Sequence, residues 1–475
     1  MMFKRFLWLS LTSTFALQVS ATTIVINPGA GFDDATPSNT IPDQRGNNPG
    51  NTLGEMRLKL FQEAARVWGD ILNSNVTITV DALFADLNCF GAAAQLGHAG
   101  PTSTNEDFGA GDPNIAYPIA LAESLSGSNQ NGAAAEITAT FNANVDSDNG
   151  CLGASFYYGL DDNAPPGTAP LFAVVLHELG HGLGFLSYIT ANGGWLNGTM
   201  DPYSRLLMDL ESGKSWGAMS NLERQNSQLN EPNLVWTGAK VTADRAKHLA
   251  PATELRINAP APVGEFVANL GQQSTAIPVG GLTAAVVDGK SINDLDGDPA
   301  DGCQQISFTG DAYAGKIVMF DTTATCQVVI QVTLSERDGA VGVIIAETAA
   351  SGIADVTGVL AGEIKIPYIG IAKSEADHLR TNIGAANVTF QNSASKFIGE
   401  NQGKLKIYAP LVLDPGSSVS HWSKTATPDL LMEPAEGTLI FKNVDLTAAA
   451  FQDIGWSVNI PGAALEVIYI DGFEN

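Results

Sequence analysis

Basic residues are scarce in this chain. Its 475 residues include 24 Lys and Arg against 50 Asp and Glu, which gives a formal net charge of −26 at pH 7. A surface this acidic argues against nucleic acid and anionic membranes as partners, although it does not identify a substrate. Beyond the first 21 residues no segment is apolar enough to cross a bilayer, so we expect no membrane span. The oligomeric state stays open.

Cysteine is also rare. The chain has 4 cysteines, and no two of them have the C-x-x-C spacing of a cysteine zinc cluster. An even number in an exported chain predicts two disulfides. Because each pair should lie within one domain, we expect Cys89–Cys151 and Cys303–Cys326.

The N-terminus has the pattern of an export signal. Lys4 and Arg5 precede an apolar run from Phe6 to Leu17, and Val19-Ser20-Ala21 then gives small residues at the cleavage position. The run is too short for a membrane span. We therefore predict a cleaved signal peptide over residues 1–21 and a secreted, extracellular protein.

The chemistry of the chain is indicated by His177-Glu178-Leu179-Gly180-His181, an H-E-x-x-H motif. On a helix, residues four apart share a face, so both imidazoles can bind one Zn²⁺. Glu178 would lie beside the metal as the general base that activates water. Pro170 suits the start of this helix and Gly184 its end. No G-x-S-x-G elbow supports Ser/His/Asp catalysis.

A catalytic zinc needs a third protein ligand. The compact metzincin motif H-E-x-x-H-x-x-G-x-x-H is only partly present, because Gly184 fits the glycine position but Ser187 stands where the third histidine belongs. Glu223 is a carboxylate alternative of the gluzincin kind. The other histidines are His98, His248, His378 and His421.

Segments on both sides of a long insertion resemble the leishmanolysin group of metzincins. They are His177–Phe185, His421-Trp422, Leu431-Met432-Glu433-Pro434 and Ala449–Trp456. The resemblance is loose over residues 50–190 and good over 415–457. It implies an α+β catalytic domain, a twisted sheet with a zinc-binding helix, and His421 as third ligand. It also implies that Met432 forms the floor beneath the zinc. Ser423 departs from the acidic residue that relatives often carry after His-Trp.

The insertion at residues 259–396 has a different composition. It lacks tryptophan, is rich in β-branched residues, and contains short strands such as 316–320, 341–345 and 366–371. Gly315-Lys316-Ile317-Val318 and the apolar run that ends at Ile345 resemble a protease-associated (PA) domain of α/β type. We thus divide the chain into a signal peptide (1–21), a catalytic domain in two parts (22–258 and 397–460), the inserted PA domain (259–396) and a tail (461–475).

Thr52 and Glu55 predict a capping box in front of an amphipathic helix that reaches Ile71. Strands are expected at 23–26, 76–80 and 136–143. In the last, Ile137 and Ala139 are candidates for a sheet edge that binds an extended peptide. Asp294, Asp296, Asp298 and Asp301 could ligate Ca²⁺, but they lack the EF-hand's length and closing Glu, so we read a solvated loop.

The favoured function is a secreted zinc metalloendopeptidase that acts on protein or peptide substrates with one catalytic Zn²⁺. Two alternatives stay open: a non-catalytic binding or adhesion protein on a metzincin scaffold, and a zinc exopeptidase. No residue can be named for stabilising the oxyanion.

Overall fold

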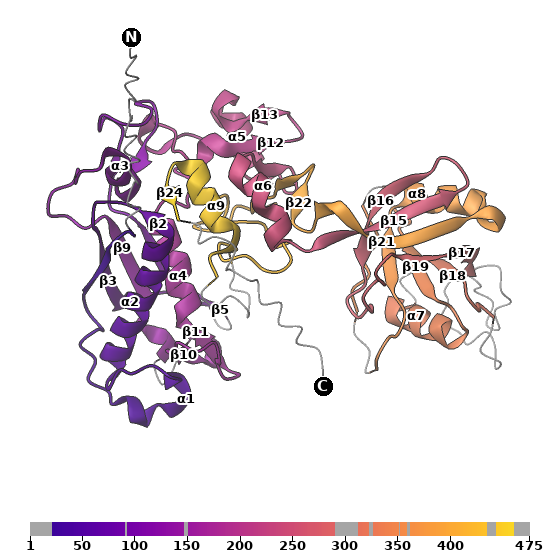
Figure 1. Cartoon of the computed structure of the whole chain (residues 1–475), viewed down its shortest axis with the longest axis horizontal. Helices are drawn as coiled ribbons and strands as arrows, with labels where there is room; N and C mark the ends of the chain where they lie inside the picture. Colours follow the sequence, from indigo (N-terminus) through magenta and orange to yellow (C-terminus); the bar gives the residue numbers. More distant parts are fainter. Residues whose placement is uncertain are drawn as a thin grey trace, which may run out of the picture. The chain divides into compact units, whose positions relative to one another are not determined.

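The computed structural model describes residues 21–90, 93–146, 151–289, 312–322, 326–350, 352–358, 362–434 and 443–459. Residues 1–20 of the predicted signal peptide, the four aspartates at 294–301, Cys303 and the tail lie outside this part. The chain forms two compact units, Met1–His248 with Gly399–Asn475, and Leu249–Ile398 (Figure 1). None of the helices in the described part is long and apolar enough to cross a membrane.

The first unit contains a four-stranded sheet with the order β1-β3-β9-β6. These strands are β1 (Ile24–Pro28), β3 (Ile78–Ala85), β9 (Ile137–Asn142) and β6 (Gly97–Pro101). β1 and β9 run parallel to β3, whereas β6 is antiparallel to β9. Side chains alternate between a buried and an exposed face along β3, so one face of the sheet forms the core.

Two helices cover the buried face, α2 (Leu53–Ile71) and α4 (Leu171–Gly182). They lie side by side in Figure 1, and the Trp68 indole N–H of α2 donates to the Leu176 carbonyl of α4 at 2.9 Å. Thr52 caps α2 as predicted, accepting from the Glu55 N–H. The Glu55 carboxylate, however, accepts from Asn51 rather than from Thr52, so the reciprocal bond of the predicted box is displaced by one residue.

The rest of the first unit consists of smaller elements around this core. Its longer helices are α3 (Ile119–Ser126), α5 (Asn221–Ser227), α6 (Ala239–His248) and α9 (Asp445–Ile454). A three-stranded sheet has the order β13-β12-β14, with β13 (Lys214–Ser215), β12 (Leu207–Asp209) and β14 (Leu234–Trp236).

The remaining short elements of this unit are α1 (Pro42–Arg45), β2 (Leu72–Asn73) with β24 (Ser457–Val458), β4 (Cys89–Phe90) with β5 (Ala93–Ala94), β7 (Thr104–Asn105) with β8 (Tyr117–Pro118), β10 (Ser155–Tyr157) with β11 (Thr168–Pro170), and β22 (Glu400–Asn401) with β23 (Lys404–Leu405).

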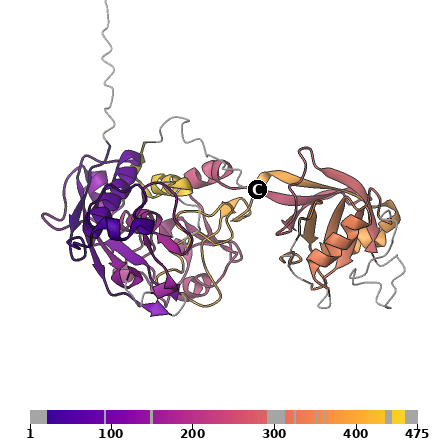
Figure 2. The same cartoon turned by 90° about the horizontal axis from the view of Figure 1, so that it is seen from below.

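The second unit is a closed barrel with the order β15-β16-β20-β19-β18-β17-β21. Its strands are β15 (Pro251–Ala259), β16 (Gly264–Leu270), β17 (Leu282–Asp288), β18 (Ile317–Asp321), β19 (Gly342–Ala346), β20 (Tyr368–Ile371) and β21 (Asn387–Phe397). Helices α7 (Val328–Arg337) and α8 (Lys373–Thr381) pack against it, and Figure 2 shows the curvature of its strands. The predicted start at 259 was too late, because β15 already pairs with β16 and β21.

Strands β18 and β19 are buried on both faces, which explains their apolar runs. In β18, Ile317 and Met319 join the cluster that includes α8, whereas Val318 and Phe320 join the cluster that includes α7. A strand between two apolar layers shows no polar alternation, so its signal in the sequence is a continuous apolar run.

Candidate metal centre

Helix α4 presents the H-E-x-x-H motif from the interior of the first unit. Every residue from Leu171 to Gly182 is buried, and His177, Glu178 and His181 are 7%, 8% and 8% exposed. The helix packs against α2 and against strands β6 and β9. The histidine pair is therefore held on a rigid element, as a preorganised site requires.

The C-terminal end of α4 turns the chain back toward its second histidine. Gly184 has φ +116°, a conformation that L side chains rarely adopt. Its N–H donates to the His181 carbonyl and the Phe185 N–H donates to the Gly180 carbonyl, both at 3.0 Å, which is a Schellman motif. The reversal brings the Phe185 carbonyl within 2.7 Å of His181 Nδ1.

The third imidazole comes from a hairpin far along the chain. The Tyr408 N–H donates to the His421 carbonyl at 3.0 Å, and the Val419 N–H donates back to the Tyr408 carbonyl at 2.8 Å. His421 is 5% exposed and stands against the face of α4 that carries the motif.

Backbone carbonyls set the tautomer of all three rings. In each ring Nδ1 lies 2.7 Å from a carbonyl oxygen: Leu431 for His177, Phe185 for His181 and Ser417 for His421. A carbonyl only accepts, so each Nδ1 must carry a proton and donate. In the neutral ring this leaves a lone pair on Nε2, the arrangement typical of metal-ligating histidines.

The three Nε2 atoms converge on one point. They are 3.0 Å apart for His177 and His181, 3.1 Å for His181 and His421, and 3.2 Å for His177 and His421. Three lone pairs cannot hydrogen-bond to one another, so the cluster needs a cation. Tetrahedral zinc, with Zn–N of ~2.0–2.1 Å, separates its nitrogens by about 3.3 Å, and the donor set fits it.

Burial keeps these rings neutral. Loss of hydration lowers the pKa of His177 from 6.5 to about 4, and the same cause, with repulsion from His177, lowers the pKa of His181 to about 3. The pKa of His421 falls well below its usual value, because of burial first and the two neighbouring imidazoles second. Near neutral pH all three Nε2 lone pairs are therefore available to a metal.

Met432 lies directly under the motif, at the place expected for the floor. It is 0% exposed, and a Cβ built at Gly180 would stand 2.8 Å from its Sδ. Gly180 thus lets the methionine approach the helix between the two histidines. The same turn supplies the Leu431 carbonyl to His177, and the Leu431 N–H is held by the Asp445 carboxylate of α9.

Glu178 directly follows the first ligand on α4 and is also buried. Burial raises the pKa of its carboxyl from 4.5 to about 8, and a backbone hydrogen bond from Ala99 opposes this rise. A metal ion in the cluster would favour the carboxylate and lower that pKa. The side chain is therefore suited to exchange a proton near neutral pH.

The predicted substrate edge was placed on the wrong strand. Ile137 and Ala139 belong to β9, which pairs with β3 on one side and β6 on the other, and they are 0% and 1% exposed. The edge strands of the sheet are β1 and β6, and β6 is the one next to β9. Because antiparallel hydrogen bonding alternates along a strand and Leu96 is bonded to Asn142, the backbone of Gly97 and Ala99 faces the open side.

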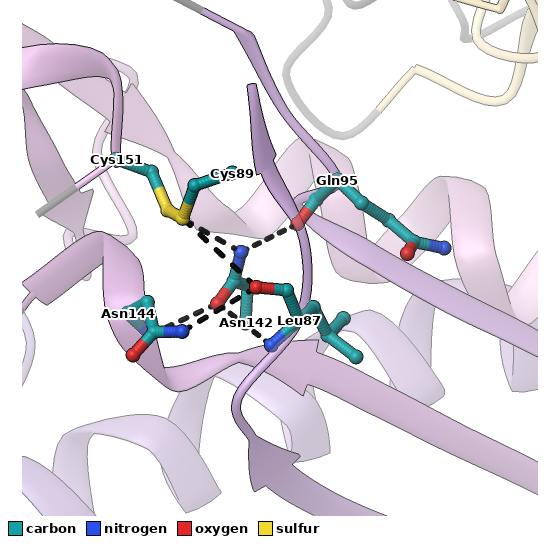
Figure 3. The surroundings of a disulfide bond; sticks show 6 residues. All are labelled: Leu87, Cys89, Gln95, Asn142, Asn144 and Cys151. Carbon is teal, nitrogen blue, oxygen red and sulfur yellow. Dashed lines mark hydrogen bonds between the residues drawn. A yellow bond between two sulfur atoms is a disulfide. The ribbon is translucent and has the colours of Figure 1, made fainter. Parts of the chain in front are cut away.

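The disulfide Cys89–Cys151 was predicted and is present, with 5.4 Å between the Cα atoms. Figure 3 shows that Asn142, at the end of β9, makes hydrogen bonds to the residues around the disulfide. The Asn142 amide donates to the Gln95 carbonyl at 2.9 Å and lies 3.7 Å from Cys151 Sγ. The crosslink thus secures the segment that leads into β6. Cys326 is also disulfide-bonded, while its predicted partner Cys303 lies outside the described residues.

The other candidate ligands lie elsewhere. Glu223 accepts from the Ser220 N–H and from Lys214 at the start of α5. His98 is exposed on β6, His248 ends α6, and His378 belongs to α8 of the second unit. In the described part of the chain, His177, His181 and His421 form the one group of three ligand side chains that meets.

Two buried aspartates and Ser423 have structural roles. Asp201 accepts from the Tyr188 N–H and from Ser204, and Asp209 accepts from the Ser212 N–H, so both shape loops. Ser423, where an acidic residue was expected, donates to the Glu231 carboxylate. A carboxylate therefore does stand beside the His421-Trp422 segment, supplied by another part of the chain.

Comparison with known proteins identifies part of the second unit. A family model for the PA domain matches residues 272–379, which confirms the expected PA domain there. No curated protein matches the chain.

Solved structures with similarity include BSAP, a zinc aminopeptidase from Bacillus subtilis (17% identity, 32% of this chain and 36% of that chain, TM-score 0.24). Others are an aminopeptidase from Aneurinibacillus sp. strain AM-1 (20%, 31% and 32%, 0.23) and the subtilisin-like protease Apa1 from Pseudoalteromonas sp. AS-11 (11%, 44% and 39%, 0.21). The chain spans 32–39% of the length of these proteins. Similarity at this level carries no argument about chemistry.

Proposed function

We propose that this chain is a zinc metallopeptidase that cleaves internal peptide bonds of proteins or peptides. The observation that supports it is the convergence of three buried Nε2 atoms, 3.0–3.2 Å apart, each with its Nδ1 on a carbonyl. Three lone pairs that face one another repel unless a cation lies between them, and Glu178 lies one residue from the first ligand.

In this proposal His177, His181 and His421 hold the metal. Bound there, zinc would polarise the substrate carbonyl and make its water acidic enough to lose a proton near pH 7. The Glu178 carboxylate accepts that proton and then donates it to the nitrogen of the leaving amine. The Ala99 hydrogen bond orients the carboxylate for both steps.

The substrate would bind along β6. An extended peptide can pair with an open sheet edge. The backbone of Gly97 and the Ala99 carbonyl offer one, while the Ala99 N–H is bonded to Glu178. A strand that continues on either side of the scissile bond suits an endopeptidase, because it does not require a chain terminus. The position of Met432 under Gly180 supports the metzincin-like, leishmanolysin-like assignment.

We also propose that the protein is exported. The basic and apolar pattern from Lys4 to Leu17 and the disulfide Cys89–Cys151 support this assignment. The second unit, as an inserted PA domain, would be exported as part of the same chain.

Cleavage of casein, with and without a chelator, tests the proposal. Wild-type protein should cleave it, the chelator should abolish cleavage, and Glu178→Gln should bind zinc but cleave at least ~10²-fold more slowly. Mapping product termini from one long peptide separates internal from terminal cleavage. Full activity of Glu178→Gln would refute the mechanism, and products that differ from the substrate by one terminal residue would show an exopeptidase.

A further inference from the structure

Val419, two residues before His421, has an unusual backbone conformation. Its φ is +73°, in the left-handed region, and its side chain is 0% exposed. β-branched residues rarely adopt this region, because Cβ crowds the backbone. A conformation of this kind persists only where surrounding contacts enforce it, and such residues concentrate at functional sites.

One buried contact to Val419 comes from Tyr203. Its phenolic O–H donates to the Val419 carbonyl at 2.8 Å, and the Tyr203 side chain is fully buried. The ring is fixed by edge-on contacts with Phe185, at 5.0 Å between centroids, and with Trp236, at 4.8 Å. The Phe185 carbonyl also orients His181. The aromatic side chains that hold Tyr203 therefore adjoin the segments of both His181 and His421.

A second contact joins the same two segments. The Ser187 N–H donates to Ser420 Oγ at 3.1 Å, one residue before His421. Ser187 Oγ lies 2.6 Å from Ser204 Oγ, which donates to Asp201. Because the carboxylate can only accept, the Ser187 hydroxyl is the donor to Ser204. Ser187 is thereby fixed from both sides.

The contacts of Ser187 and Tyr203 connect two zinc-ligand segments that lie far apart in the sequence. His421 is separated from His181 by 240 residues, including the whole second unit, so chain connectivity cannot fix one ligand relative to the other. Ser187 and Tyr203 follow His181 closely in sequence and touch the residues just before His421. They can therefore fix the position of His421 relative to α4.

We propose that Tyr203 and Val419 form a clamp, the Tyr203–Val419 clamp, which positions His421 for the metal. The clamp holds Val419 in a strained conformation that aims the His421 ring at the motif histidines. Tyr203 is a positioning residue in this scheme and does not touch metal or substrate. The inference rests on the proposed zinc site.

Tyr203→Phe tests the clamp by removing one hydroxyl. Zinc affinity, measured by competition with a chromogenic chelator, should fall about 10- to 100-fold, the usual effect of losing a partner that orients a ligand. The visible spectrum of the cobalt-substituted protein should change as well, because it reports ligand geometry. The matched control is Tyr158→Phe, since Tyr158 is equally buried and also loses a hydrogen bond, to Asp146. It should lower the melting temperature without changing zinc affinity or the cobalt spectrum.

The strain is tested by comparing Val419→Gly with Val419→Ala. Both lose the buried methyl groups, but only glycine adopts φ +73° without cost. The glycine variant should therefore melt no lower than the alanine variant, whereas at an ordinary position it would melt lower. A glycine variant that melts several degrees below the alanine variant would show that Val419 is unstrained.

The proposed function and the clamp can fail separately. If wild-type protein binds no zinc, the proposed function is wrong. If it binds zinc and cleaves casein while Tyr203→Phe keeps wild-type zinc affinity and cobalt spectrum, the function stands and the clamp is wrong. Should Tyr203→Phe not fold, the comparison of Val419→Gly with Val419→Ala still tests the strain on which the clamp depends.

Discussion

Replacing Glu178 by Gln should make the metal-free protein more stable while abolishing its activity. The carboxyl is 8% exposed, and its pKa is raised from 4.5 to about 8, chiefly by burial. Between these two values the folded state keeps a proton that the unfolded state has released. The free energy of unfolding of wild-type protein therefore falls as pH rises through this window, by about 1.4 kcal/mol per pH unit.

At pH 7 this cost amounts to about 3 kcal/mol. Glutamine has the same shape and can still accept from Ala99, but it does not titrate. The difference in unfolding free energy, Glu178→Gln minus wild type, should be near zero at pH 4.5 and should grow to about 3 kcal/mol at pH 7. With zinc bound the difference should shrink, because the cation favours the carboxylate.

Urea unfolding at several pH values, with chelator and then with zinc, measures this difference. Glu363→Gln, on the surface of the second unit, gives the effect of the same change at an exposed position. A difference for Glu178→Gln that is constant from pH 4.5 to 8 would refute the reasoning, since it would mean that the carboxyl is ionised in the folded metal-free protein.

Three further predictions concern stability. The double variant Cys89→Ser, Cys151→Ser should lose about 4 kcal/mol in urea unfolding, since the disulfide joins residues 62 apart in sequence; an unchanged midpoint would contradict this. Gly180→Ala should lower the free energy of unfolding by about 1 kcal/mol, because crowding of Met432 costs ~1–3 kcal/mol and the higher helix propensity of alanine returns ~1 kcal/mol. A variant more stable than wild type in urea unfolding would mean that Met432 is loosely packed. Chelation of protein held in zinc at a hundredfold excess over its dissociation constant should remove about 3 kcal/mol, visible as a lower melting temperature, and no shift would show that zinc does not bind the folded state.

The sequence predicted the elements whose information is local. The motif helix needs two histidines four residues apart and an apolar surround, and α4 has both. It could not predict the groups that orient the rings. The partners of the Nδ1 atoms are backbone carbonyls of Leu431, Phe185 and Ser417, and a carbonyl is present at every residue, so no residue type marks its position.

The prediction of the edge strand was wrong for a different reason. The strand expected at 136–143 is present as β9, but a strand pattern in the sequence does not say which strand lies at the edge of a sheet. Strand β6 reads Gly-His-Ala-Gly-Pro and has no strand signal of its own. Its conformation depends on pairing with β9, and its glycines and terminal proline are tolerated because an edge strand makes hydrogen bonds on one side only.

Gly184 shows why part of a motif can persist when its third ligand has moved. In the compact metzincin pattern this glycine is followed three residues later by the third histidine, and here Ser187 stands there instead. The structure gives Gly184 a role that does not depend on that histidine: its positive φ closes α4 and brings the Phe185 carbonyl onto His181 Nδ1. The glycine thus fixes the tautomer of the second ligand, a requirement that is the same wherever the third ligand comes from, while the Ser187 position is free to serve as an anchor for Ser420.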